Sequence, residues 1–507
     1  MARTPNDKPL SLGENALGRG LALITLALLA LGVVLVQSAL ASVNEPGAWY
    51  HRVDVRHTIF AVAAILVLLA ACHFDYRRLA RPRGGLPVWA VVVFCGAMIT
   101  GLLVFVPGLG KQMGTYYRWV RFGPPQYNIQ FQPSELIKYA LVILLAALFT
   151  MQPQRCRRAP WVLGALGVIA VAMALVITQD MGTAIIIGAA GLTTMLLAGV
   201  PWYYAAALLP PAAVGFWYYI THMAVKMARI GAWMDPWSQE NASSHQVRES
   251  LLAITSGGWF GKGPGNSVMK LGYLPERTTD YIFAVFCEEW GLMGSLLLFA
   301  LLAAWAWYVR CTAVKANNRF GSVLAAALGF TILLQALMHI AVNLNVLPPT
   351  GICLPFVSYG GTQMLILAVA AALIISVSAR REMATEDGMM EAAEESAAES
   401  PQAQAAIAES PEPEATVAAD PQSPNAAAES PGAEGAVAGS PEGTTATTAV
   451  EPPAPPVDLD ASAAPVTVDD LDAFLATQNP EPLFADLEEK PTTEAQSKTR
   501  DENDRTN

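Results

Sequence analysis

The sequence predicts an all-α protein that crosses a membrane many times. Of its 507 residues, 53% are hydrophobic and only 14% are charged, and the mean hydropathy is +0.37. Soluble globular proteins carry about 25% charged residues. The apolar residues are also grouped into runs that can cross a hydrocarbon core about 30 Å thick. Arginine and lysine, finally, gather in short segments between alternate runs, as the loops of a polytopic membrane protein do.

About ten apolar runs, most of them roughly 18–25 residues long, can span a bilayer as helices. In chain order they cover residues 20–42, 57–74, 87–107, 136–150, 161–178, 182–200, 201–222, 281–308, 322–346 and 364–379. Proline breaks or kinks a helix, so Pro201, Pro210 and Pro211 allow the stretch 182–222 to be divided in more than one way. The first run lacks the small-residue cleavage site of a signal peptide, and we expect it to be an uncleaved helix.

Basic residues in the short loops predict the orientation of the helices, because cytoplasmic loops are enriched in lysine and arginine. The basic loops hold Arg77, Arg78, Arg81 and Arg83; Arg155, Arg157 and Arg158; Arg310, Lys315 and Arg319; and Arg380 with Arg381. Both the N-terminal segment 1–19 and the chain that follows the membrane domain 20–381 are then cytoplasmic, as an even number of spans requires. The outer face carries segments 108–135, 223–280 and 347–363, and the largest, 223–280, lies between the seventh and eighth spans.

Residues 382–507 form a region of different composition, rich in Ala, Glu, Pro and Ser, with irregular repeats such as AAESP and AAESPGAE. Such a tail cannot bury enough apolar surface to offset its ordering entropy, so we expect it to be disordered. Within it, VTVDDLDAFLATQ (466–478) has the spacing of a short helix face. This segment is either a chance apolar cluster or a docking motif for a cytosolic partner.

Several classes of function are excluded by composition and motifs. The net charge of −11 comes mostly from the tail, and no basic domain points to nucleic acid. The six cysteines are scattered, without CxxC spacing, and we interpret them as structural. The six histidines show neither HxxxH nor HExxH spacing, which predicts no zinc site. There is also no GxSxG motif and no cytosolic ATP-binding domain.

The stretch LGYLPERTTDYIFAVFCEEWG (271–291) places Asp280 where the outer segment meets an apolar run. A partly desolvated carboxylate has a raised pKa, which suits a general base acting on a hydroxyl. The alternative is a helix N-cap, since TTD before an apolar run is typical of a helix start. Glu288 and Glu289 follow at a depth where an unpaired charge is costly. We interpret them as the polar lining of a wet cavity beneath Asp280.

The outer segment 223–280 also contains a predicted helix and a glycine-rich stretch. HQVRESLLAITS (245–256) has helical spacing and, with three tryptophans nearby, is expected in the membrane interface. GKGPGNS (261–267) lacks the spacing of a phosphate loop, but its glycines, with Lys262 and Lys270, could bind an outer pyrophosphate or sugar. Simple turn glycines and solvated lysines explain this stretch equally well.

Two further outer segments carry polar groups. In YYRWVRFGPPQYNIQFQPSELIKYA (116–140), Arg118 and Arg121 bracket Trp119, an arrangement that could hold phosphate and stack against a sugar. Glu135 and Lys138 are spaced i,i+3, and their likeliest sole role is to neutralise each other inside the bundle. The segment 343–365, rich in Pro, Gly and Asn, must dip into the protein, because its backbone cannot face lipid. Asp180 has the position of a helix start.

These motifs together resemble the SEDS family (shape, elongation, division and sporulation), whose members polymerise lipid II into peptidoglycan strands. The motifs stand here as RWVRFG…FQPSELIK, TQDMGTA, GKGPGNSVMKLGYLPERTTDYIFAVFCEEWGLMG and LPPTGICLPFVSYGG, and the resemblance covers roughly residues 15–382. The GNS…K…YLPE form is closer to the division branch, FtsW, than to the elongation branch, RodA; a sporulation branch, SpoVE, shares it.

The resemblance implies a role for particular residues. The family's essential aspartate corresponds to Asp280, although its usual histidine is replaced by threonine in PERTTD, which puts a role for the histidine in doubt. The implied substrate-binding residues are Arg118, Trp119, Gln132, Ser134, Glu135, Lys138, Lys270, Glu276, Ser358, Tyr359 and Gly360. Among them, Arg118, Lys138 and Lys270 would stabilise the charge of the leaving pyrophosphate, alone or with a divalent cation, Mg or Mn, as cofactor; no metal ligand is implied.

The implied reaction is inverting glycosyl transfer at the outer face of the bacterial cytoplasmic membrane, at the division septum. Asp280 would deprotonate the acceptor lipid II, and undecaprenyl pyrophosphate would leave. The implied partners are a class B penicillin-binding protein (FtsI-like) and divisome activators. A lipid II flippase, an elongation-type (RodA-like) polymerase and a recruiting scaffold are the rival interpretations; a flippase predicts charged residues through the whole membrane depth.

Overall fold

The computed structural model describes residues 14–41, 52–113, 116–122, 129–237, 241–271 and 273–380. The chain divides into two units, Met1–Pro411 and Glu412–Asn507, and all described residues belong to the first. The predictions for the tail 382–507, including the helical motif 466–478, therefore lie outside the described residues.

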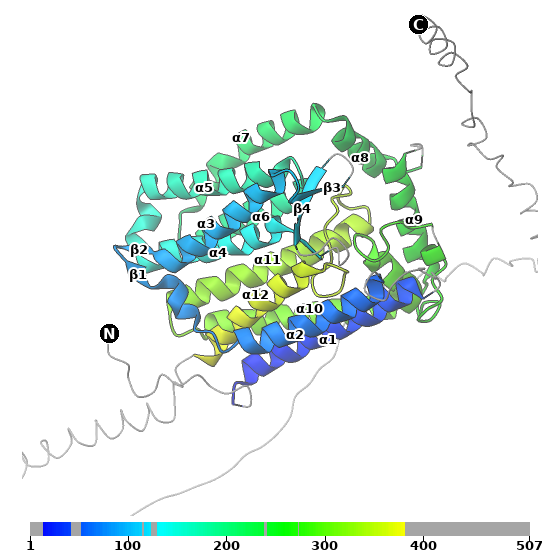
Figure 1. Ribbon diagram of the computed structural model, residues 1–507, viewed down its shortest axis with the longest axis horizontal. Coiled ribbons are helices and arrows are strands. Elements are labelled where there is room, and N and C mark those ends of the chain that lie inside the picture. The colour runs from blue at the N-terminus through cyan, green and yellow to red at the C-terminus, as the bar shows by residue number, and fades with distance from the viewer. Residues whose placement is uncertain are drawn as a thin grey trace, which may run out of the picture. The chain divides into compact units, whose positions relative to one another are not determined.

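The described residues are mostly helical, as predicted (Figure 1). The α-helices are α1 (Ala16–Leu40), α2 (Val53–Ala71), α3 (Val88–Leu102), α4 (Pro133–Met151), α5 (Ala159–Ile177), α6 (Met181–Leu197), α7 (Trp202–Thr221), α8 (Ala224–Met234), α9 (Ala242–Ser256), α10 (Ile282–Val314), α11 (Arg319–Asn343) and α12 (Thr362–Ala379). Short 3-10 helices cover Tyr76–Ala80, Leu103–Phe105, Pro153–Arg157 and Met269–Leu271.

Eight of these helices are long and apolar enough to cross a membrane within the described part of the chain: α1 to α5 and α10 to α12. The span of α3 includes the 3-10 turn that follows it and runs over Val88–Phe105, 18 residues. The apolar α6, with 17 residues, is just too short to be counted. Helix α7 has 20 residues but contains Pro210 and Pro211 in its interior. A multi-pass membrane protein is therefore confirmed, whereas ten spans with both termini in the cytoplasm remain a prediction.

Three helices form the centre of the bundle. Their most apolar windows are 83% buried in α4, 67% in α11 and 83% in α12, against 22% in α2 and α3. The buried run Ile137–Ala147 of α4 is apolar on all sides apart from Lys138, which is the pattern of a helix surrounded by other helices. The peripheral helices expose large apolar side chains, such as Leu66, Val92 and Leu163, which suits contact with lipid.

Strands in two loops are a departure from the predicted all-α fold. In the first outer segment, β3 (Gly110–Met113), β4 (Tyr116–Phe122) and β5 (Ile129–Phe131) form an antiparallel sheet of order β3-β4-β5. A second pair, β1 (Pro82–Arg83) and β2 (Leu86–Pro87), closes a hairpin in the first basic loop. A run of apolar residues predicts a spanning helix, but it gives no signal for such short polar strands.

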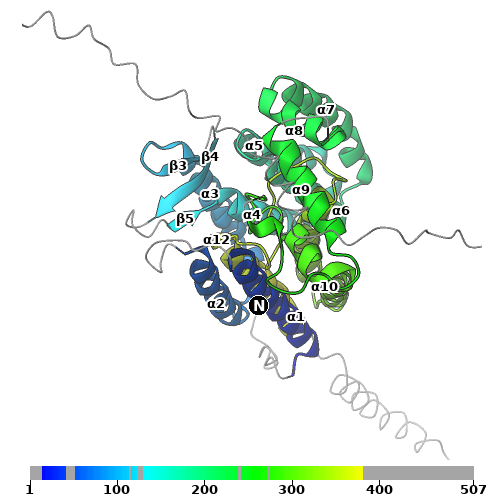
Figure 2. The ribbon, with the colours of Figure 1, turned by 90° about the vertical axis from the view of Figure 1, so that its right-hand side faces the viewer.

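The β3-β4-β5 sheet lies at the end of the bundle that also carries α8 and α9, and the β1-β2 hairpin lies at the opposite end (Figure 1). Viewed from the first end, the sheet lies on one side of the spanning helices, and α8 and α9 lie on another (Figure 2). The helix predicted from HQVRESLLAITS is confirmed as α9, which begins at an Asn241 capping box. The two predicted outer segments 108–135 and 223–280 therefore lie together.

Helix α10 is broken at Gly291, whose φ of 63° and ψ of −162° are not helical. The turn 257–263 crosses the helix at this break. The N–H groups of Leu292 and Met293 donate to the carbonyls of Gly258 (2.9 Å) and Trp259 (3.1 Å), and the N–H of Lys262 donates to the Glu288 carbonyl (2.9 Å). A Cβ at Gly261 would lie 2.2 Å from the Glu289 carbonyl oxygen, so only glycine permits this approach.

The glycine-rich stretch surrounds an anion that belongs to the protein itself. Glu288 is fully buried, and its carboxylate accepts hydrogen bonds from Lys262 Nζ (2.7 Å), Ser267 Oγ (2.5 Å) and the Val268 N–H (3.0 Å). Lys262 is therefore paired with an acid of the protein itself, and the binding of an external pyrophosphate by GKGPGNS stays a prediction.

Glu289 is held in the same layer. It is fully buried and accepts a hydrogen bond from Ser38 Oγ at the end of α1 (2.6 Å), and Ser38 in turn accepts one from the Gly265 N–H (2.9 Å). Lys270 is also buried and donates to the carbonyls of Ser38 and Gly265. The two glutamates fasten the outer segment to α1 and α10, and they do not line a wet cavity.

We expect Glu288→Gln to destabilise the protein before it affects chemistry. The variant leaves Lys262 without its counter-ion and weakens the bonds around the carboxylate. Because the Lys262 side chain is one third exposed, the loss should be smaller than the cost of breaking a fully buried pair, on the order of 1–3 kcal/mol. Thermal unfolding of the purified protein should show a lower midpoint than wild type, whereas the folded fraction should keep its specific activity. Exposed Lys315→Gln, directly after α10, serves as control. An unchanged midpoint would contradict this structural role.

Candidate active site

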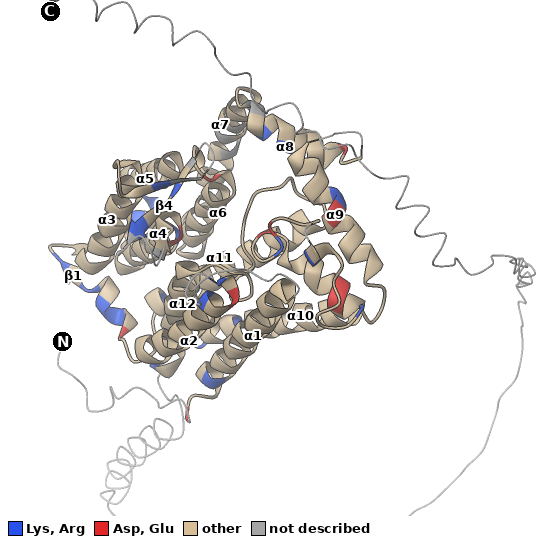
Figure 3. Cartoon of the chain, turned by 45° about the vertical axis from the view of Figure 1, so that its right-hand side comes forward, with Lys and Arg blue, Asp and Glu red and all other residues tan. Residues whose placement is uncertain are grey.

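The candidate site lies where four segments meet at the α8 and α9 end of the bundle. They are the turn 276–281 before α10, strand β4, helix α8 and the segment 344–361 between α11 and α12. Charged residues are sparse along the long helices (Figure 3), so a cluster of them in one place is informative. Asp280, Glu276, Arg118, Arg229 and Asp180 lie close enough to influence one another electrostatically.

The backbone around Asp280 is held from both sides. Ser358 Oγ donates to the Thr279 carbonyl (2.8 Å), and the Tyr359 N–H donates to the Thr278 carbonyl (2.9 Å). From α11, Asn343 Nδ2 donates to the Asp280 carbonyl (2.9 Å). The SYGG motif thus fixes the turn that carries the aspartate.

Asp280 does not cap α10. The helix begins at Ile282, its N-cap residue is Tyr281, and no side chain caps it. The N-cap alternative is therefore wrong for this structure. The helix start at Asp180 is confirmed instead: Asp180 is the N-cap of α6 and accepts hydrogen bonds from the Thr183 N–H (3.0 Å) and Oγ1 (2.9 Å).

The Asp280 carboxyl is half-buried and faces Arg118 across Gly351. A methyl group at Gly351 would lie 3.4 Å from Asp280 Oδ2 and 3.8 Å from Arg118 Nη1. Burial of the carboxyl, aided by the charge of Glu276, raises the pKa of Asp280 to about 7, although Arg118 and Arg229 act in the opposite direction. A carboxyl with this pKa can both accept and release a proton near neutral pH.

Two basic side chains, Arg118 and Arg229, act on this carboxyl, and both also act on a third, Lys226. Arg118 of β4 donates from Nε to the Gln179 carbonyl (2.7 Å), and Arg229 of α8 donates to the Pro349 carbonyl (3.4 Å). Lys226, one turn before Arg229, is 1% exposed. Burial, together with the charges of Arg229 and Arg118, lowers the pKa of Lys226 to about 8. Such a concentration of positive charge suits a polyanionic ligand.

Lys226 and Arg229 were not predicted from the sequence. They lie in the stretch that was assigned to the loop after the seventh span, where basic residues are usually solvated. The available signal is their i,i+3 spacing within MAVKMARIGAW, which places both on one face of α8.

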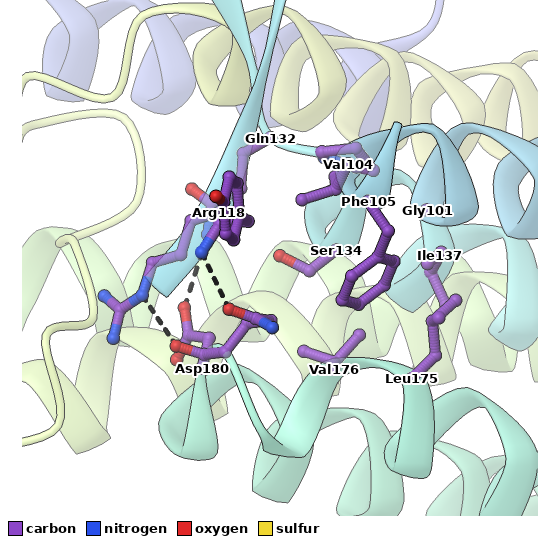
Figure 4. A pocket seen from close by; sticks show the side chains of 13 residues that line it. Gly101, Val104, Phe105, Arg118, Gln132, Ser134, Ile137, Leu175, Val176 and Asp180 are labelled. Atoms are coloured by element: carbon purple, nitrogen blue, oxygen red, sulfur yellow. Dashed lines mark hydrogen bonds between the residues drawn. The ribbon is translucent and has the colours of Figure 1, made fainter. Parts of the chain in front are cut away.

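A pocket begins beside Arg118 and continues between the helices (Figure 4). Its polar residues are Arg118, Gln132, Ser134, Gln179 and Asp180, and its apolar ones are Gly101, Val104, Phe105, Tyr117, Pro133, Ile137, Leu175 and Val176. Gln132 Nε2 donates to Asp180 Oδ2 (3.3 Å). Of the predicted substrate-binding residues, Arg118, Gln132 and Ser134 therefore share one polar rim above an apolar wall.

Glu135 and Lys138 form the ion pair predicted from their spacing, with 2.8 Å between Glu135 Oε2 and Lys138 Nζ. Lys138 is fully buried and also donates to Gln335 Oε1 (2.5 Å). Gln335 in turn donates to the Cys353 carbonyl (3.0 Å). This chain of contacts connects α4 and α11 to the segment that carries Gly351.

The remaining predicted residues lie at the edge of the site or away from it. Strand alternation places Trp119 on the face of β4 opposite Arg118. Glu276 is exposed, and its carboxylate accepts a hydrogen bond from Thr279 Oγ1 (2.8 Å). The Tyr359 ring packs 5.9 Å from that of His57, and Gly360 precedes the N-cap of α12. Lys270 belongs to the glycine-rich layer described above.

A divalent cation would find few ligands in this chain. Within the described ranges, no three His, Cys, Asp or Glu side chains come close enough to hold a metal ion. Magnesium is commonly held by one or two carboxylates, water and substrate phosphates. An Mg²⁺ or Mn²⁺ ion here would therefore take most of its ligands from the substrate.

Known proteins resemble both the sequence and the fold. The probable peptidoglycan glycosyltransferase FtsW of Alkalilimnicola ehrlichii is 33% identical over 72% of this chain and 90% of its own length. Its counterpart from Thioalkalivibrio sulfidiphilus is 35% identical over 71% and 88%.

Solved structures share the fold at lower identity. The rod shape determining protein RodA of Thermus thermophilus superimposes with a TM-score of 0.52 at 22% identity, over 75% of this chain and all of that chain. A chain from a study entitled "Structural coordination of polymerization and crosslinking by a peptidoglycan synthase complex" gives 0.59 at 21% identity, over 72% and 98%. The family model described as cell cycle protein, FtsW/RodA/SpoVE, matches residues 19–383. The chain belongs to this family.

Proposed function

We propose that this protein is a peptidoglycan glycosyltransferase that polymerises lipid II into glycan strands, with Asp280 as its general base. The observation that carries the proposal is the Asp280 carboxyl, fixed through its backbone, with a pKa of about 7, opposite Arg118. The names of its relatives support the same reaction.

In the proposed reaction, Asp280 removes the proton from the GlcNAc 4-hydroxyl of one lipid II molecule. The oxygen attacks the MurNAc anomeric carbon of the lipid-linked donor, and the bond from that carbon to the pyrophosphate oxygen breaks. The bonding electrons leave with undecaprenyl pyrophosphate, and the configuration at the carbon inverts. Asp280 then releases its proton to water, for which a pKa near 7 is well suited.

The leaving group develops negative charge, and we assign its stabilisation to Arg118, Arg229 and Lys226. The charges of Arg118 and Arg229 act on Asp280, and they also act on Lys226, which lies one turn before Arg229. Lys138 is paired with Glu135, and Lys270 donates to the carbonyls of Ser38 and Gly265. Lys138 and Lys270 would then act by holding the site in place. The pocket beside Arg118, with its polar rim and apolar wall, would take the junction between pyrophosphate and lipid.

We further propose that the enzyme acts at the division septum of the bacterial cytoplasmic membrane, with a class B penicillin-binding protein and divisome activators as partners. The described residues contain no transpeptidase-like domain, so crosslinking would require a second chain. The name FtsW of its relatives favours division over elongation.

The rival function is a lipid II flippase, and a third is a scaffold without activity. The cluster of Asp280, Arg118, Arg229 and Lys226 at one end of the bundle favours chemistry at that end over transport through it. The test is to reconstitute the protein with its partner, block transpeptidation, supply lipid II and analyse the products. Glycan strands are expected. Translocated lipid II without strands would favour the flippase, and neither product the scaffold.

The pKa of Asp280 predicts a pH-dependent stability. The unfolded carboxyl has a pKa near 3.8 and the folded one a pKa of about 7, so folding is favoured by the bound proton. This contribution is complete below about pH 4 and is lost as the pH rises through 7. Asp280→Asn imitates the protonated form. Its unfolding midpoint should equal that of wild type near pH 4 and should exceed it increasingly as the pH rises to 8. An equal difference at both pH values would contradict the assigned pKa.

A further inference from the structure

A large apolar groove lies away from the candidate site, between the end of α4 and the start of α5. It has a volume of about 430 Å³. Its walls include Leu144, Leu145 and Leu148 of α4 and Trp161, Gly164 and Val168 of α5. No polar or charged side chain lines it, so its occupant must be a hydrocarbon.

Arg155 connects the segments at one end of the groove. The guanidinium of Arg155 lies 4.1 Å from the centre of the Trp161 ring. It also donates to the carbonyls of Leu148 (3.2 Å) and Gly85 (2.8 Å). One buried arginine thus fixes the end of α4, the start of α5 and the hairpin turn between β1 and β2.

The open side of the groove lies along α5 at Gly164. Gly164 is exposed, and a Cβ there would meet no atom within 4 Å. Gly167, three residues later on the same helix, is also exposed with the same free space, but it does not line the groove. A side chain added at Gly164 would therefore enter the groove, whereas one added at Gly167 would not.

We call the end of the groove at Pro160 its mouth; Pro160 lines the groove, and Arg157 and Arg158 lie three and two residues before it in the chain. Arg157 and Arg158, in the segment that joins α4 to α5, are exposed. Neither forms an ion pair with a described residue, and the sequence contains no Asp or Glu from 136 to 179. Short loops of this composition lie on the cytoplasmic side, where the leaflet carries anionic lipids.

We propose that this groove binds an acyl chain of an anionic phospholipid from the cytoplasmic leaflet, with the lipid phosphate held by Arg157 and Arg158. The charge at the mouth decides the occupant. A transmembrane helix of a partner would fill the groove with apolar side chains and leave both guanidinium groups without a ligand. A phospholipid would instead place its acyl chain in the groove and its phosphate at the two arginines. The site is independent of the proposed glycosyl transfer.

Photolabelling of the full-length protein tests the site. The protein is reconstituted in phosphatidylcholine nanodiscs that contain a trace of phosphatidylglycerol with a diazirine in its acyl chain. After irradiation, labelled peptides from residues 144–168 are expected. Unlabelled phosphatidylglycerol should compete, and phosphatidylcholine should not. Gly164→Phe should abolish the labelling of this region, whereas Gly167→Phe should retain it.

The mouth is tested separately by Arg157→Gln and Arg158→Gln, which leave the groove intact. Each should weaken competition by phosphatidylglycerol about fivefold, the factor that corresponds to about 1 kcal/mol per basic residue. The proposal is overturned by equal labelling with a phosphatidylcholine probe, by labelling that survives Gly164→Phe in a protein with a wild-type melting point, or by displacement of the lipid when a partner protein is added.

Discussion

Asp280→Asn is expected to abolish glycan-strand formation while the protein stays folded. Asparagine has the shape of aspartic acid but cannot take up the proton of the attacking hydroxyl. The backbone bonds from Ser358 and Asn343 that hold this turn do not involve the replaced group. General-base catalysis contributes about 10²–10⁴-fold, so the rate should fall by at least the lower figure. The measurement is gel analysis of strands made from lipid II with transpeptidation blocked.

The control for this experiment is Glu249→Gln. Glu249 lies on α9 in the same outer layer and is paired with His245 at 3.6 Å, away from the reacting groups. It should polymerise at the wild-type rate. Strands formed by Asp280→Asn at the wild-type rate would remove Asp280 from the mechanism, whereas loss of activity in both variants would indicate that the outer layer tolerates no change.

The long helices and the position of the aspartate could be predicted from the sequence because each depends on a local pattern. A spanning helix requires only a run of apolar residues, and the helical spacing of apolar residues in α9 is visible within the 12 residues 245–256. The PERTTDYIFA motif likewise lies in one stretch. The family resemblance then separated a general base from an N-cap at Asp280, two roles that local sequence alone left equal.

The partners of charged residues could not be predicted, because they come from distant parts of the chain. Glu288 is paired with Lys262 at 2.7 Å, 26 residues away, across a turn that forms only where Gly291 breaks α10. Lys138 is bound by Gln335, 197 residues away. Sequence analysis assigned Lys138 and Lys270 to the substrate; the structure shows their bonds within the protein, and it also brings Arg229 of α8 close enough for its charge to act on Asp280.

There is a physical reason why some charged residues have partners within the protein and others lie at the site. A buried charge is tolerated only when it is paired and hydrogen-bonded. In the glycine-rich layer around Glu288, and in the chain of contacts from Glu135 to Cys353, most polar groups therefore have partners within the protein. The charged groups that can contact a ligand lie instead around Gly351. There a glycine with φ of 76° keeps a side chain from entering between Asp280 and Arg118.

Arg118→Gln should lower the polymerisation rate about 10²–10³-fold, the usual effect of removing one group that stabilises developing charge. Arg121→Gln is the matched control: Arg121 is exposed and lies three residues later on β4, hence on the opposite face of the strand. Arg118→Lys should recover only part of the rate, because a lysine cannot keep the bond to the Gln179 carbonyl and contact the pyrophosphate at once. A greater loss with Arg121→Gln than with Arg118→Gln would place the pyrophosphate on the other face of β4, beside Trp119 rather than Asp280.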